Sequence, residues 1–194
     1  SEASASIRVV HTIVHPDYVR KWFSNPLHDI ALLHLETPVA LSTYPLLASA
    51  SETEALMASG ATPAWTLGWG AFSFSDLLNK QTPDALQELQ LPIGSEERCQ
   101  TYATTETSYV KYQAPEMICA GFRYQNAGVC FGDSGGPLFV LTDKGQPCLV
   151  GITSWAEACG GTGGYLEGFT RVSHYRSWIM DTLALYAPTH WEPH

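Results

Sequence analysis

The sequence predicts an all-β, globular, soluble protein, and three observations carry this prediction. Short apolar segments bounded by turn residues recur along the chain. Glycine and proline are plentiful, with 16 and 12 residues, whereas charged residues make up only 15% of the 194 positions. Hydrophobic residues make up 45%, which is enough to bury a real core. This profile is closer to a turn-rich β protein than to a helical bundle.

The first 63 residues of the chain contain two expected strands and a linker. Asp29 stands directly before the second strand, at the head of the apolar stretch DIALLHL. Residues 37–63 are rich in proline, serine and alanine, and we interpret them as a connection between two halves. The expected strands of the whole chain cover residues 7–14, 30–35, 64–69, 86–91, 117–120, 137–141 and 148–155.

One helix is predicted, at the end of the chain. Val172, Tyr175, Ile179 and Leu183 recur at helical spacing behind Ser173, a residue type that caps helix N-termini. The sequence therefore predicts a helix over 173–186, followed by a loose tail over 187–194.

Charge and cysteine usage exclude several classes of function. The net charge of -9, with ten basic against nineteen acidic residues, argues against a nucleic-acid partner. No apolar run reaches the roughly 18 residues that a membrane span needs. The five cysteines form no C-x-x-C and no paired Cys/His spacing, which favours disulfides over a zinc site. We therefore expect no metal and no cofactor, and a secreted, extracellular or periplasmic location.

The stretch CFGDSGGPLF, residues 130–139, places Ser134 among turn-forming residues. Gly132-x-Ser134-x-Gly136 also satisfies the nucleophile elbow of α/β-hydrolases, in which a helix follows the serine. Here the apolar segment LFVL follows, which predicts a strand and opposes an esterase of that class. By itself, the motif is also compatible with a tight surface turn.

Further motifs accompany this serine in a defined order. HDIALLHLETPV, LGWG, MICAGF, VGITSW and FTRVSHYRSWI follow one another as they do in the chymotrypsin/trypsin family of serine proteases, and the sequence resembles that family roughly from residue 7 to residue 185. The resemblance implies a double Greek-key antiparallel β-barrel fold with a C-terminal α-helix. It divides the chain into the end of a first barrel (1–41), an inter-barrel linker (42–63), a second barrel (64–172), the helix (173–186) and the tail (187–194).

The resemblance assigns roles to four residues. Ser134 matches the nucleophile, and Asp29 matches the buried aspartate that orients the catalytic histidine. The backbone N–H groups of Gly132 and Ser134 match the oxyanion hole. Asp133 matches the residue that pairs with a newly cut N-terminal amine in activated members. A carboxylate at the head of an apolar strand is costly without a partner, which agrees with the role of Asp29.

The base that such a serine requires is not evident in this sequence. None of the seven histidines lies in the family's Ala-Ala-His-Cys context, and His28 cannot fold back to bridge its neighbour Asp29 to Ser134. In the family the histidine precedes the aspartate by several tens of residues, whereas 28 residues precede Asp29 here. We therefore expect the histidine before residue 1, on an N-terminal chain of the same precursor, with this chain as the larger part of a two-chain enzyme made from a zymogen.

The resemblance also pairs four of the five cysteines. It implies disulfides Cys99–Cys119 and Cys130–Cys159, and it leaves Cys148 over. Two interpretations of Cys148 stay open, a disulfide to the segment that carries the histidine and a buried free thiol.

Specificity is implied by the residues that match the family's substrate pocket. Gly128 occupies the floor position where trypsin has an acid, which argues against arginine specificity. Val129 adds apolar surface, and Ala156 replaces a usual glycine and narrows the entrance. The remaining positions that match substrate-binding residues are Phe131, Ser154 and Trp155, of which the last two belong with Ala156 to the segment that pairs with substrate backbone.

The pocket wall has two alternative alignments. One places Glu167 on the wall, which suits aromatic and lysine side chains, and the other places Gly168 there, which leaves a plain apolar pocket. We expect cleavage after an aromatic or apolar residue, with lysine tolerated and arginine disfavoured. The expected function is a secreted serine endopeptidase that acts on peptides and proteins and binds protease inhibitors; the alternative is a pseudoprotease that binds without cutting.

Overall fold

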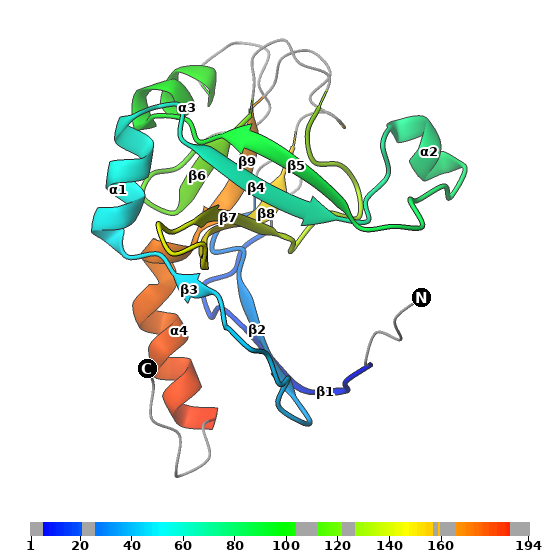
Figure 1. The fold of residues 1–194 in the computed structure, drawn as a ribbon, viewed down its shortest axis with the longest axis vertical. Coiled ribbons are helices and arrows are strands. Elements are labelled where there is room, and N and C mark those ends of the chain that lie inside the picture. Colours follow the sequence, from blue (N-terminus) through cyan, green and yellow to red (C-terminus); the bar gives the residue numbers. More distant parts are fainter. Residues whose placement is uncertain are drawn as a thin grey trace.

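A computed structural model describes residues 6–20, 26–103, 112–121, 127–156, 159 and 166–186. The described chain is mostly β, with one small sheet and one large, curled sheet (Figure 1). The small sheet pairs β1 (Val9–Val14) with β2 (Ala31–Leu35), antiparallel. It lies beside the C-terminal helix α4 (Val172–Tyr186), where His11 of β1 contacts Tyr186.

The large sheet has the strand order β5-β4-β7-β8-β9-β6, and every pairing along this path is antiparallel. The short β3 (Leu46–Leu47) adds to β8 in parallel. The other strands are β4 (Pro63–Gly68), β5 (Gln87–Pro92), β6 (Met117–Ala120), β7 (Pro137–Leu141), β8 (Pro147–Trp155) and β9 (Glu167–Arg171).

The two ends of this sheet meet. Beyond β5, the amide of Gly94 donates to the carbonyl of Cys119 at 2.9 Å, and the amide of Gly121 donates to the carbonyl of Pro92 at 3.0 Å. These bonds join the end of β5 to β6, which lies at the opposite edge of the sheet. The strands therefore curl into a barrel without a free edge at this point.

The barrel interior is filled by apolar side chains that are inaccessible to solvent, among them Leu91, Ile93, Ile118, Leu138 and Phe169. A second apolar cluster joins Ile30, at the start of β2, to Val172, Tyr175 and Ile179 of α4. The second cluster fixes the residue next to Asp29 against the helix. Burial of such side chains contributes about 1.5–3 kcal/mol each.

All seven predicted strands are present within two residues of their expected bounds, and the predicted terminal helix begins one residue early, at Val172. The expectation of a single helix was wrong. The structure adds α1 (Ala50–Ala58), α2 (Phe74–Leu78) and α3 (Glu96–Ala103). Within the expected linker, α1 forms because Ser49 and Glu52 make a reciprocal capping box. In the described part of the chain, no helix has the length and apolar character to cross a membrane.

Candidate active site

The loop around Ser134 is held by backbone hydrogen bonds on both sides of the serine. The amide of Asp133 donates to the carbonyl of Cys130 at 3.1 Å, and the amide of Gly136 donates to the carbonyl of Asp133 at 2.8 Å. Gly132 has a φ of +102°, a conformation that disfavours any side chain. The loop therefore presents Ser134 as an exposed residue on a tightly bonded turn.

Two neighbouring segments clamp this loop. On one side, the amide of Gly135 donates to the carbonyl of Thr153 in β8 at 2.9 Å, and the disulfide Cys130–Cys159 adds a covalent tie. On the other side, the amide of Ala71 donates to the carbonyl of Phe131 at 2.9 Å. The serine loop thus lies between the end of β8 and the loop that leads into α2.

The carboxylate of Asp133 points away from the serine, toward the loop after β4. Its Oδ1 accepts from the amide of Gly70 at 2.8 Å, and its Oδ2 accepts from the amide of Cys130 at 2.9 Å. A side chain at Gly68 would place its Cβ 1.9 Å from Asp133 Oδ1. Glycines at 68 and 70, in the motif LGWG, therefore make room for this carboxylate.

Asp29 lies at the head of β2, as the sequence predicts, and is partly buried. Its Oδ2 accepts a hydrogen bond of 2.6 Å from the hydroxyl of Ser154 in β8. Its backbone carbonyl accepts from the hydroxyl of Thr170 in β9 at 2.7 Å. Two strands of the large sheet therefore orient a carboxylate that belongs to the small sheet.

A cavity of about 320 Å³ connects several of the predicted site residues. It brings together Ser134, Ser154, Trp155 and Ala156, with Phe131 at its border 53% exposed. The hydroxyl of Ser154 donates to the Asp29 carboxylate, and Ser154 lines the cavity that Ser134 lines. This hydroxyl therefore connects the Asp29 carboxylate to the cavity. The full lining is Arg20, Val129, Cys130, Phe131, Ser134, Thr153, Ser154, Trp155, Ala156 and Cys159.

Glu167 lies behind this cavity rather than on its surface. Its side chain is 2% exposed, and Oε1 accepts from the amide of Val129 at 2.6 Å. Burial raises the pKa of Glu167 to about 8, while the Val129 hydrogen bond acts in the opposite direction and the charge of Asp133 adds to the rise. Oε2 is buried and has no hydrogen-bond partner in the described part of the chain.

The neighbouring Gly168 faces a different residue. A Cβ at this position would lie 1.9 Å from Cε2 of the Trp155 indole, so the ring packs directly on the glycine. Because successive residues of a strand point to opposite faces, Glu167 is directed toward Val129 and Gly168 toward Trp155. Neither of these two residues lines the cavity with Ser134.

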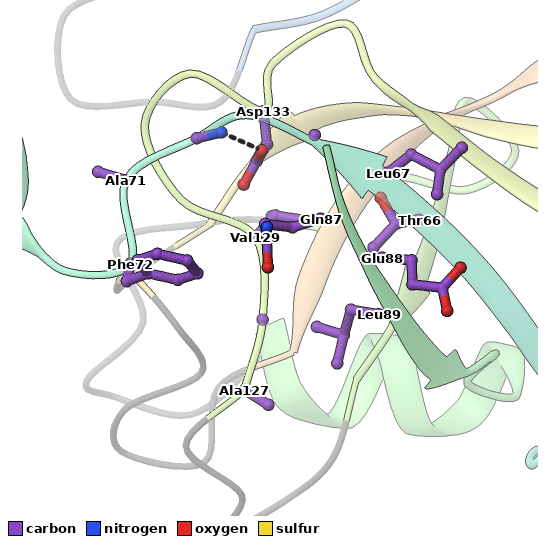
Figure 2. Close-up of a pocket in the computed structure, with 13 residues that line it drawn as sticks. Thr66, Leu67, Ala71, Phe72, Gln87, Glu88, Leu89, Ala127, Val129 and Asp133 are labelled. Atoms are coloured by element: carbon purple, nitrogen blue, oxygen red, sulfur yellow. Dashed lines mark hydrogen bonds between the residues drawn. The ribbon is translucent and has the colours of Figure 1, made fainter. Parts of the chain in front are cut away.

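A second cavity, of about 290 Å³, is lined by Asp133 and by residues of β4, β5 and the loop after β4 (Figure 2). Gly128, expected at the floor of the substrate pocket, lines this second cavity, whereas Val129 lines both. Asp133 stands at one end, with its bond to Gly70 drawn as a dashed line. The lining also includes the large side chains of Leu67, Phe72, Gln87, Glu88 and Leu89.

The histidine next to Asp29 is engaged elsewhere. His28 Nδ1 lies 3.2 Å from the hydroxyl of Tyr175, and its Nε2 lies 3.7 Å from Oε1 of Glu116. His15 stacks on His28 with ring centroids 5.1 Å apart and also contacts Trp178. Burial lowers the pKa of His15, and the charge of His28 lowers it further.

The other described histidines also lie near α4, with His11 on β1, His34 on β2 and His174 on the helix itself. His11 stacks on His34, and both contact Tyr186 near the end of α4. His174 packs edge-on against Tyr175 at 4.7 Å. The described histidines therefore gather where the small sheet meets α4, whereas the carboxylate of Asp29 accepts a hydrogen bond from Ser154. His190 and His194 lie outside the described residues.

Both disulfides implied by the resemblance are present, Cys99–Cys119 and Cys130–Cys159, and Cys148 is free and buried. No group of three or more His, Cys, Asp or Glu side chains within the described ranges is arranged to hold a metal ion.

Sequence reasoning missed three residues of this site. Gly70 stands in the quoted motif LGWG, so its role in holding Asp133 could have been inferred from the two glycines there. Thr170 comes directly after the apolar Phe169, but no feature of the surrounding sequence indicates its hydrogen bond to Asp29. Arg20 lines the cavity with Ser134, although 114 positions separate them, and no local pattern indicates it.

A comparison with protein-family models agrees with this arrangement. The model of the trypsin family, described as Trypsin, matches residues 1–179. The match extends from β1 through the first half of α4 and therefore contains Asp29, Ser134 and the lining of both cavities. The chain belongs to the trypsin family of serine proteases.

Proposed function

We propose that this chain supplies the nucleophile and the aspartate of a secreted serine endopeptidase. The observation that carries the proposal is the link from Asp29 through Ser154 to the cavity that exposes Ser134. Ser134 lies on the loop before β7 and Asp29 lies directly before β2, and Ser154 connects the Asp29 carboxylate to the cavity that Ser134 lines. An acid oriented by a hydroxyl and an exposed serine on a rigid turn are two parts of a Ser-His-Asp triad.

The reaction needs an imidazole between these two groups. The imidazole takes the proton of Ser134 as Oγ forms a bond to the scissile carbonyl carbon, and Asp29 stabilises the imidazolium. The imidazolium then gives this proton to the leaving amine as the C–N bond breaks, which leaves an acyl-enzyme ester. Water hydrolyses the ester by the same proton route and restores Ser134.

We assign this imidazole to polypeptide outside the 194 residues. In support, the five described histidines contact one another, Tyr175, Tyr186 and Trp178 along α4. The proposed arrangement is a two-chain enzyme, derived from a zymogen, in which an N-terminal chain carries the base.

The oxyanion hole is proposed to consist of the N–H groups of Gly132 and Ser134. Within the described ranges neither N–H donates to a protein acceptor. Both are therefore available to the oxygen that gains negative charge in the tetrahedral intermediate.

The second cavity is proposed to receive the activating N-terminus. Asp133 supplies a carboxylate at one end, and Leu67, Phe72 and Leu89 supply apolar surface for the side chain of the terminal residue. An ammonium bound to Asp133 would hold the loop from Cys130 to Ser134 in its present conformation, because that carboxylate also accepts from the Cys130 amide.

Specificity for aromatic or apolar residues before the cut, with lysine tolerated, is proposed from the walls of the first cavity. Val129 and Trp155 provide apolar surface, and the described lining contains no acid. Glu167 lies one residue deeper, with Oε2 buried and unpaired, where the ammonium of a lysine could reach it. A secreted location is supported by the two disulfides.

The test is active-site labelling of the full protein, including the segment that carries the proposed base. A diphenyl phosphonate ester should form one adduct, mapped by mass spectrometry to Ser134, together with loss of peptidase activity. Ser134→Ala should abolish both, whereas Ser177→Ala, an exposed serine of α4, should change neither. Binding of peptides without labelling or turnover would instead support a pseudoprotease.

A further inference from the structure

Asp29 lies in a tight backbone turn. The amide of Ile30 donates to the carbonyl of His28 at 2.9 Å, which closes a three-residue turn with Asp29 at its centre. His28 has a φ of +50°, a left-handed conformation that is unfavourable for a residue with a side chain. The turn therefore needs contacts that hold it, and these contacts also set the direction of the Asp29 side chain.

The side chain of His28 makes contacts of this kind. Its Nδ1 lies 3.2 Å from the hydroxyl of Tyr175, and its Nε2 lies 3.7 Å from Oε1 of Glu116. One face of the ring stacks on the ring of His15, with the two planes 11° apart. Both ring nitrogens and one ring face are thus engaged by three different side chains.

The three partners of this ring are fixed in other parts of the fold. Tyr175 of α4 is 3% exposed and belongs to the apolar cluster that also contains Ile30. The carbonyl of Glu116, directly before β6, accepts from the amide of Arg171 in β9 at 2.8 Å. The amide of His15, directly after β1, donates to the carbonyl of Ile30 at 3.0 Å. The imidazole of His28 is therefore held from the large sheet, from the small sheet and from α4.

Tyr175 and His15 act on both neighbours of Asp29. Both contact the ring of His28, which precedes the aspartate, and both contact Ile30, which follows it. Burial raises the pKa of the Tyr175 hydroxyl, and the charges of Glu116 and Asp29 raise it further. The hydroxyl therefore stays protonated at neutral pH and is available as a hydrogen-bond donor.

The other bonds near Asp29 leave the conformation of His28 open. The hydroxyls of Ser154 and Thr170 bond the side chain and the carbonyl of Asp29 itself. Before the turn, Leu27 exchanges two backbone hydrogen bonds with Val19, of 2.9 and 3.1 Å. His28 is the residue between this fixed point and Asp29, so its conformation decides how the chain enters the aspartate.

We propose that His28 is a positioning residue for the proposed triad: Tyr175, Glu116 and His15 hold its imidazole, and the imidazole maintains the turn that directs the Asp29 carboxylate. Among the described residues His28 is not part of the cavity lining around Ser134, so it acts through Asp29 and not on the substrate. This inference rests on the proposed peptidase function and adds to it a contribution from outside the cavity.

The test replaces His28 in the full active protein and measures hydrolysis of a peptide methyl ester. His28→Gly removes the ring but permits the left-handed backbone, so the turn can take other conformations and kcat should fall by about tenfold at unchanged KM. His28→Asn tolerates the left-handed conformation and places an amide near the position of Nδ1, so it should restore most of the lost kcat. The kcat is expressed per molecule labelled at Ser134 by the phosphonate at completion, so misfolded protein is not counted.

Two further variants test the route and the specificity of the effect. Tyr175→Phe removes one hydroxyl and keeps the buried ring, so kcat should fall severalfold, with no further loss when it is combined with His28→Gly. His34→Asn removes another imidazole from the junction of the small sheet and α4, where His34 contacts Tyr186, and should leave kcat unchanged.

Four results would overturn the inference. The kcat of His28→Gly could equal that of the wild type, or the change could be confined to KM, which would place His28 in substrate binding. The losses in His28→Gly and Tyr175→Phe could add, or His28→Asn could be as slow as His28→Gly; either result would show that the bond to Tyr175 does not hold the turn. If the wild type neither hydrolyses the ester nor is labelled at Ser134, the peptidase proposal and this inference both fail.

Discussion

The hydroxyl of Ser154 donates a 2.6 Å hydrogen bond to the carboxylate of Asp29, across the junction between β8 and the small sheet. Ser154 also borders the cavity that contains Ser134. A residue that the sequence assigns to substrate contact therefore orients the proposed acid as well.

This dual position predicts a graded response to substitution. Ser154→Ala removes the donor but leaves a space that water from the cavity can fill. The kcat for hydrolysis of a peptide methyl ester should therefore fall by less than about tenfold. Ser154→Val fills the space with methyl groups and leaves Asp29 without a donor, so its loss should be several times larger. Equal losses in the two variants would show that the hydrogen bond is not the cause.

Glu167 should make stability decrease with pH. Burial raises the pKa of this carboxyl from an ordinary value of 4.5 to about 8 in the folded chain. Between these values the folded chain holds a proton that the unfolded chain has lost. The free energy of unfolding should therefore fall by up to about 1.4 kcal/mol per pH unit from this group.

The measurement is urea unfolding between pH 5.5 and 7.5. Glu167→Gln has no proton to lose, so the difference between wild type and variant isolates the contribution of this residue from that of the histidines. A difference that does not change with pH would contradict a buried, protonated Glu167.

Titration of the Glu167 carboxyl should also change the preference between lysine and phenylalanine before the cut. At pH 6.5 a neutral Glu167 offers little attraction to a lysine ammonium, whereas at pH 8.5 its carboxylate attracts the cation. The ratio of kcat/KM for lysine over phenylalanine before the cut should rise severalfold across this range. In Glu167→Gln the ratio should stay level, and a rise that persists there would exclude Glu167 as its source.

Gly168 should be intolerant of any side chain. A Cβ at this position would lie 1.9 Å from the Trp155 indole, so Gly168→Ala must displace the ring or the strand. We expect a loss of about 1–3 kcal/mol in stability and a higher KM for peptides. Gly145→Ala, with no atom within 4 Å, tests a glycine at positive φ in open space and should leave KM unchanged.

Cys148 should be a slow, buried thiol. It is 4% exposed, and burial raises its pKa, so less thiolate is present at neutral pH. Without reductant, a thiol reagent should react slowly with the native protein and titrate Cys148 promptly in denaturant. No reaction at Cys148 under denaturing conditions would favour the other interpretation, a disulfide to a second segment.

The strands were predictable because their signals are local. Alternating or continuous apolar runs between turn residues mark β1, β2 and β4 through β8, and the pattern behind Ser173 marks α4. The helix α1 was missed although Ser49 and Glu52 form a capping signature, because the surrounding alanine and serine suggested a linker. The strand β9 was missed because glycine and a buried acid, Gly168 and Glu167, interrupt its apolar pattern.

The site was predictable where a motif carries it and not where tertiary contacts build it. GDSGG and HDIALL identify Ser134 and Asp29 from the family resemblance. The two alignments of Glu167 and Gly168 could not be separated by sequence, because the choice depends on which residue faces Val129 and which faces Trp155. The bond from Thr170 to Asp29 depends on the meeting of two sheets.

Alkylation by a peptidyl chloromethyl ketone tests most directly the claim that the base comes from outside this chain. The reagent, with phenylalanine before the reactive group, should inactivate the full protein and alkylate one imidazole. Peptide mapping should place this histidine outside the 194 residues, and Ser134→Ala should slow the reaction. Alkylation of any of the seven histidines of this chain, His190 and His194 included, would contradict the account.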